Sequence, residues 1–421
     1  MGNFMKFFQT KVVPIMVRLG NQRHLNAVRN GLVLVIPFII IGSAFLIIGN
    51  LPIEGWAETL GSFGTKLAAP VAVTFGVLAL IVSAGIGYNL AKAYGLDGIS
   101  GAILSLVGFL LTQLTEEYTL NIDNFGAPGL FTAIVIALLS VEIFRFCVTR
   151  GLIIKLPEGV PSAVANSFVS LVPAAVVIIL LWTIRVVADF NITQFLTVLF
   201  SPVVFALNTL PGILVYEFMV CLLWTVGIHG DTVVGSIGEP IFLQFLAANT
   251  AAYAAHEAVP YITATGFHNM FVLIGGTGAT LGLVLLMLRS KEKTYKSLGK
   301  LAFPSAIFQI NEPVTFGFPI VLNPTMMIPF IFTPLILTTG TYLLMDFGMI
   351  AKPVAMVPWT MIPILGPFLT TGGDWRAAAW SAICIIISVI VYYPFFKSAE
   401  KQQLAEEAGV AETTADQTIT M

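Results

Sequence analysis

The sequence predicts an all-α polytopic membrane protein with about ten transmembrane helices, because apolar runs of about 20 residues recur along the chain. Of its 421 residues, 57% are hydrophobic and only 10% are charged. A soluble domain carries about 25% charged residues. The mean hydropathy of +0.92 also indicates a chain that lies mostly in lipid.

The composition and motifs narrow the function classes. The net charge of −2 argues neither for nor against a charged partner, and we expect no nucleic-acid partner. No GxxxxGK[ST] or dinucleotide motif occurs, so we expect neither an ATP-hydrolysing site that could drive transport nor a cofactor site in this chain. Cys147, Cys221 and Cys384 lie in or beside apolar runs with no CxxC pair. They are expected to be packing residues, with no disulfide and no metal site.

The N-terminal segment is basic. Lys6, Lys11, Arg18, Arg23 and Arg29 precede the first apolar run, which is too long for the apolar region of a cleavable signal. Basic residues concentrate in cytoplasmic loops, so the N-terminus is expected in the cytoplasm. The mixture of apolar and basic side chains over residues 4–23 predicts an amphipathic helix on the membrane surface.

The first half of the chain is regular. Its nearly uncharged runs predict spans at residues 31–50, 68–92, 99–114, 129–146 and 167–187. The acidic loop 115–124 suits the outer face, and Arg145, Arg150 and Lys155 suit the cytoplasm. Residues 191–210, interrupted by Pro202 and Asn208, are expected to form an interfacial or crossover helix that links two halves. We therefore place a domain boundary near residue 200.

The second half is less regular. Spans are predicted at residues 212–226, 266–288, 326–344 and 377–396, and a disordered cytoplasmic tail at 398–421. Segments 231–258, 301–322 and 353–369 are too polar or proline-rich for plain spans. The basic cluster at 289–300 should be cytoplasmic, yet counting every candidate as a crossing places it outside. Since broken backbone at membrane depth survives only in protein or along a cavity, these segments indicate a transporter binding site.

A short repeat supports that interpretation. Residues 238–241 (Gly-Glu-Pro-Ile) and 311–314 (Asn-Glu-Pro-Val) each place Glu-Pro ahead of an apolar run. Proline starts or stops a helix, so the pair predicts two matching re-entrant hairpins. Chance is the alternative explanation for two dipeptides.

Two ionisable residues are the main site candidates. An ionisable group at the centre of a membrane helix costs about 2.5–3.5 kcal/mol and usually faces a cavity or a partner. His229 stands between Gly227 and Gly230, and its ring could hydrogen-bond a sugar hydroxyl. Glu312 could accept hydroxyl protons or act as a base. The alternatives are a buried histidine bonded to a carbonyl and a glutamate exposed in a loop.

Other polar and aromatic residues have weaker signals. Trp224 and Trp359 could stack on a sugar ring, or could equally belong to an interfacial belt. His256 and His268 match no metal-ligand spacing and are expected in supporting or loop positions. Glu239 is undecided.

Two motifs carry a family resemblance. Residues 224–230 read Trp-Thr-Val-Gly-Ile-His-Gly, and residues 308–314 read Phe-Gln-Ile-Asn-Glu-Pro-Val. With Thr-Gly-Gly-Asp-Trp at 371–375, they make nearly the whole chain resemble the enzyme IIC component of the bacterial phosphoenolpyruvate-dependent sugar phosphotransferase system. The most similar branch is the lactose/cellobiose (diacetylchitobiose) family.

The resemblance implies a glucose-superfamily enzyme IIC architecture in the bacterial plasma membrane. Residues 1–200 would form the N-terminal segment and dimer interface, and 201–397 a transport domain with re-entrant hairpins and an elevator-like motion. A phosphorylated IIB protein, itself supplied by IIA, would phosphorylate the 6-hydroxyl of a β-linked disaccharide. His229 and Glu312 would be the catalytic pair that holds the sugar near its 6-hydroxyl, with Glu312 as the base. Asn311 would hydrogen-bond the sugar, and Trp224 and Trp359 would stack on it or line the pocket.

Two other function classes remain open at this point. A proton-coupled secondary sugar transporter could use Glu312 and His229 as a relay, and a membrane sensor or scaffold could keep a vestigial pocket. Broken helices with polar residues favour transport over a scaffold. The resemblance, rather than composition, favours phosphorylation over proton coupling.

Overall fold

The computed structural model describes residues 10, 14, 18, 21–51, 55–154, 156–157, 161–318 and 320–419. Within these ranges every regular element is a helix, and the single β-feature is an isolated bridge between Leu114 and Leu120. Most of the predicted surface helix at 4–23, including Lys6 and Lys11, lies outside the described residues, as does Lys155. All three cysteines are free and buried, which confirms their expected packing role.

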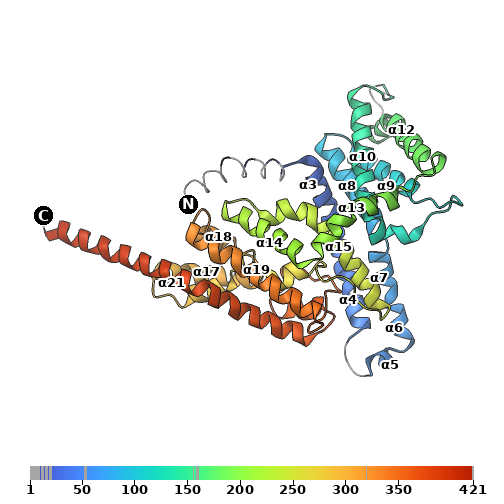
Figure 1. The fold of residues 1–421 in the computed structure, drawn as a ribbon. Coiled ribbons are helices and arrows are strands. Elements are labelled where there is room, and N and C mark those ends of the chain that lie inside the picture. The colour runs from blue at the N-terminus through green and yellow to red at the C-terminus, as the bar shows by residue number, and fades with distance from the viewer. Residues whose placement is uncertain are drawn as a thin grey trace.

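Two groups of helices lie side by side, with α15 (Gly230–Ala254) between them (Figure 1). The first group contains α3 (Arg23–Val33), α4 (Ile36–Gly49), α7 (Ala68–Phe75), α8 (Leu78–Ala93), α9 (Gly98–Thr112), α10 (Leu130–Thr149), α12 (Leu171–Trp182) and α13 (Ile192–Leu207). The second contains α14 (Leu210–Thr225), α16 (Leu281–Leu288), α17 (Lys293–Ile307), α18 (Glu312–Gly317), α19 (Pro324–Asp346), α20 (Leu365–Thr370) and α21 (Trp375–Ile419). Helix α3 packs on α8 and also contacts α15, so it forms the seam between the groups.

Six helices in the described residues are long and apolar enough to cross a membrane. They cover Arg23–Gly49, Ser62–Ala93, Ala127–Thr149, Val164–Val187, Pro324–Asp346 and Trp375–Glu406. Helices α13 and α14 together pass the same test but meet at 80°. That sharp bend agrees with the crossover predicted at residues 191–210. Helices also occupy every span predicted in the first half, although α9, with 15 residues, is shorter than the six helices that pass the length test.

A polar cluster ties α3 to the first group. His24 Nε2 lies 2.8 Å from Glu142 Oε1 of α10, and the hydroxyl of Tyr94 donates to the same oxygen. Arg145 completes the cluster with an ion pair to Glu142 of 2.7 Å. A carboxylate accepts several such bonds at once, so Glu142 fixes where α3 enters the bundle.

Two predictions for the second half are wrong. Residues 266–288 were expected to be one span, but a π-helical turn at Phe267–Val272 and a series of turns precede α16. Gly275, Gly276 and Gly278 have φ of +81°, +96° and +86°, a region that glycine enters at little cost and that ends a right-handed helix. By contrast, segment 231–258, expected to break at Glu239-Pro240, forms the continuous helix α15 with Pro240 inside it.

In two further segments the amino-acid composition accounts for the observed backbone structure. Residues 347–364 contain no helix, as their prolines predicted, and lead into the short α20. The tail expected to be disordered continues α21 as helix to Ile419. Its sequence is rich in Ala, Glu, Gln and Lys, which favour helix even without an apolar face.

Candidate functional site

A cavity of about 400 Å³ lies between α3 and the broken segments of the second group. All five residues predicted for the site line it: Trp224, His229, Asn311, Glu312 and Trp359. A volume in the range of about 300–1,000 Å³ is typical of small-molecule sites. The cavity wall also carries polar residues that the sequence did not single out, namely Arg29, Asp231, Thr232, Asn269, Thr277 and Gln309.

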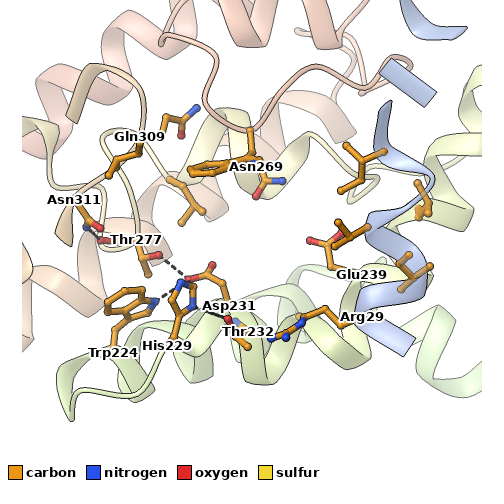
Figure 2. A pocket seen from close by; sticks show the side chains of 18 of the residues that line it. Arg29, Trp224, His229, Asp231, Thr232, Glu239, Asn269, Thr277, Gln309 and Asn311 are labelled. Carbon is orange, nitrogen blue, oxygen red and sulfur yellow. Dashed lines mark hydrogen bonds and ion pairs between the residues drawn. The ribbon is translucent and has the colours of Figure 1, made fainter. Parts of the chain in front are cut away.

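His229 is the N-cap of α15, and this fixes its chemistry. The backbone N–H of Thr232 donates to His229 Nδ1 over 3.2 Å. Since Nδ1 accepts, the hydrogen of the neutral ring must be on Nε2. His229 therefore offers the cavity a hydrogen-bond donor, not a second base. Figure 2 shows the ring beside Trp224, and their centroids are 4.4 Å apart.

Asp231 connects several residues of the cavity wall through hydrogen bonds (Figure 2). Its Oδ2 accepts hydrogen bonds of 2.8 Å from Trp224 Nε1 and from Thr277 Oγ1. Its Oδ1 lies 3.0 Å from His268 Nε2. These bonds occupy three of the roughly four acceptor positions of a carboxylate. Asp231 is therefore suited to fixing the Trp224 indole and has little capacity left for a ligand.

Behind Asp231, His268 is buried between two carboxylates. Its Nδ1 lies 2.6 Å from Oε1 of Glu217, a residue of α14 with no exposed surface. Ionised carboxylates only accept, so both ring nitrogens carry hydrogen and the ring is an imidazolium. The interpretation of His268 as a supporting residue agrees with this position. His256, in contrast, is exposed just after α15 and does not line the cavity.

Asn311 connects the break before α18 to the turns that precede α16. It is 3% exposed, and its Nδ2 donates to the Thr277 carbonyl over 2.6 Å and to Thr280 Oγ1 over 3.2 Å. A Cβ on Gly276 would lie 2.5 Å from Asn311 Cγ, so only glycine allows this approach. Asn311 thus uses its amide hydrogens for structure, and its side-chain oxygen is the group left to accept a further hydrogen bond.

Glu312 follows at the start of α18 and is exposed at the cavity wall. Within the described part of the chain its carboxylate has no hydrogen-bond or ion-pair partner. It is both a cavity residue and a solvent-accessible one, so its position alone does not decide between the two alternatives weighed from sequence. A free carboxylate at a cavity opening can accept a proton from a bound hydroxyl.

The two tryptophans differ in exposure. Trp224 is 4% exposed and its Nε1 is bonded, whereas Trp359, on the non-helical segment before α20, is 55% exposed. Trp359 therefore offers the open aromatic face, and Trp224 forms part of the fixed wall.

Comparisons with known proteins agree with this geometry. A family profile described as "Phosphotransferase system, EIIC" matches residues 29–334. The lichenan permease IIC component of Bacillus subtilis (strain 168) is 44% identical over 435 residues, covering 97% of this chain and 96% of that protein. The PTS system cellobiose-specific EIIC component of Geobacillus stearothermophilus is 37% identical, covering 97% and 96%.

A solved structure shares the fold. The transporter ChbC, the IIC component from the N,N'-diacetylchitobiose-specific phosphotransferase system, superposes with a TM-score of 0.91 at 39% sequence identity. The match covers 96% of this chain and 99% of that one.

Proposed function

Because this chain belongs to the EIIC family of the phosphotransferase system, we propose that it is a permease for a β-linked disaccharide of the cellobiose or diacetylchitobiose type. The observation that carries the proposal is the single cavity that gathers His229, Asn311, Glu312 and both tryptophans. An apolar wall with a few converging polar groups and an open aromatic face suits a sugar ring.

The cavity supports distinct roles for its two central residues. The Nε2–H of His229 donates to the 6-hydroxyl oxygen of the sugar, and the Glu312 carboxylate accepts the proton of that hydroxyl. The oxygen attacks the phosphorus of a phosphocysteine on the IIB protein, the S–P bond breaks, and the thiolate remains on IIB. The exposure of Glu312 supports this assignment, because the phosphorylated partner must approach from solvent.

The remaining features of the proposal concern architecture. The protein would be a homodimer in the bacterial plasma membrane, with about ten transmembrane helices, re-entrant segments and both termini in the cytoplasm. Residues 1–200 would form the interface domain and 201–397 the moving transport domain. IIA would rephosphorylate IIB. The seam formed by α3 and α15 supports a division into two parts.

An uptake assay tests the function. The purified chain would be reconstituted in vesicles with labelled cellobiose or diacetylchitobiose, with and without IIA, IIB and phosphoenolpyruvate. We expect the sugar to appear in the vesicles as its 6-phosphate only when all components are present. Accumulation of unmodified sugar that collapses with the proton gradient would instead establish the proton-coupled alternative.

A further inference from the structure

A second carboxylate, Glu239, lines the same cavity on α15. It lies eight residues after Asp231, which is about 12 Å along a helix at 1.5 Å per residue. Figure 2 shows Glu239 at the far side of the cavity from Trp224 and His229. A ligand that reaches both Glu239 and His229 must therefore be longer than one sugar ring.

Glu239 differs from Asp231 in its bonding. Asp231 accepts three hydrogen bonds from the protein. The Glu239 carboxylate accepts none and forms no ion pair within the part of the chain that the structure describes. A carboxylate inside a cavity needs donors, and here a ligand or water must supply them.

Arg29 of α3 also lines the cavity, and its side chain extends from the side where Glu239 lies toward Thr232 (Figure 2). Among the described residues, its guanidinium donates a hydrogen bond only to the side chain of its neighbour Asn30, over 3.4 Å. Although it shares the cavity with Glu239, the two side chains form no ion pair within 4.0 Å. The guanidinium offers donors and the carboxylate offers acceptors. Hydroxyl groups donate and accept, so a neutral sugar ring between the two residues would satisfy both.

The apolar residues beside Arg29 complete this end of the cavity. Leu32 and Val33 of the same helix and Ile36 at the start of α4 lie along the wall. They provide a surface for the C–H face of a ring, while Glu239 and Arg29 address its hydroxyls. Because α3 belongs to the first helix group and contacts α15, a ring bound here lies between that group and α15.

We propose that Glu239 and Arg29 bind the second ring of the disaccharide, the ring that is not phosphorylated, and thereby select disaccharides over monosaccharides. This inference rests on the proposed function. It assigns the cavity two ends: His229 and Glu312 hold the ring that reacts, and Glu239 and Arg29 hold the ring that does not.

Equilibrium binding to the purified full chain in detergent tests the assignment. The variants are Glu239→Gln and Arg29→Gln, with Glu257→Gln, an exposed glutamate after α15, as the matched control. The probes are labelled cellobiose and glucose. We expect each pocket variant to weaken cellobiose binding about tenfold, the effect of losing one good hydrogen bond to a charged group. Glucose, which needs only the other end, should change by less than twofold.

A kinetic readout keeps the test independent of weak glucose binding. In the reconstituted assay with IIB, the two variants should raise the KM for cellobiose and change kcat by less than threefold. Unfolding temperatures measured beside the wild type confirm that the variants fold. Unchanged cellobiose affinity, equal losses for both sugars, or a fall in kcat at constant KM would overturn the assignment. If the folded wild type binds neither cellobiose nor diacetylchitobiose, the proposed function fails first.

Discussion

The glutamates of two Glu-Pro dipeptides line one cavity, yet the backbones of the two dipeptides differ. Glu239-Pro240 lies inside the 25-residue helix α15, whereas Glu312-Pro313 begins the six-residue helix α18 after a break. Proline at the first turn of a helix loses no bond, while inside a helix it removes one. The same two residues therefore place one carboxylate on a continuous wall and the other at an exposed break.

The difference in backbone matches the different roles proposed for the two carboxylates. Glu312 is exposed, so both a ligand and a second protein can reach it. Glu239 is half-buried on a helix that also packs on α3, so a ligand in the cavity is what reaches it. A broken helix suits a group that reacts, and an unbroken helix suits a group that only binds.

Removing the reactive carboxylate should have the largest effect. Glu312→Gln keeps the shape of the side chain but cannot accept the hydroxyl proton, so phosphoryl transfer should slow about 10²–10⁴-fold. Cellobiose binding should persist. Rapid-quench transfer of phosphate from phospho-IIB to cellobiose measures the rate, with Glu257→Gln as control. Near-normal transfer would erase the distinction between the two carboxylates.

The comparison also assumes that Asp231 is part of the fixed wall and not a third ligand-binding carboxylate. His268→Leu would leave Glu217 and Asp231 without their shared cation, which should destabilise the fold by about 3–5 kcal/mol. Thermal unfolding in detergent, read against Glu257→Gln, detects this loss. A variant as stable as the wild type would mean that the network does not hold the wall.

His229 caps α15 and is proposed to donate a hydrogen bond to the sugar, and two substitutions can separate these roles. His229→Asn keeps an N-cap acceptor for α15 but removes the ring, whereas His229→Ala removes both. Only the alanine variant should lose stability, by about 1 kcal/mol. Both should slow phosphoryl transfer. If the asparagine variant transfers phosphate like the wild type, the Nε2–H plays no part at the Glu312 end.

The smallest expected effect tests the backbone contrast itself. Pro240→Ala restores a helical hydrogen bond and should raise the unfolding temperature slightly. Pro313→Ala loosens the unfolded chain and should cost about 0.4–1 kcal/mol. Paired unfolding scans compare the two. Shifts of the same sign would show that the two prolines sit in equivalent environments after all.

Much of the fold was predictable because lipid imposes long apolar runs, and the helices of the first group follow those runs. The break in the helix at residues 273–280 could not be predicted. Its glycines are as compatible with close helix packing as with left-handed backbone. The reverse error occurred at Pro240, where the neighbouring helices keep α15 continuous through a residue that usually ends one.

The site was predictable where polar residues interrupt apolar runs, as at His229 and Glu312. Asp231, two residues after His229, and Thr277 were missed, because a residue at a helix start or beside glycine has many ordinary roles. Their importance comes from contacts across 37 and 46 positions of the chain, to His268 and Asp231 respectively. The sequence contains one clue, an aspartate two residues after His229 in a region poor in charge.

A structure of this chain with bound cellobiose would test the central claim most directly. The two-ended cavity predicts the 6-hydroxyl of one ring within about 3 Å of Glu312 and of His229 Nε2, with the second ring between Glu239 and Arg29. A sugar bound in the reverse orientation, with its reactive hydroxyl at Glu239, or bound outside this cavity, would contradict the account.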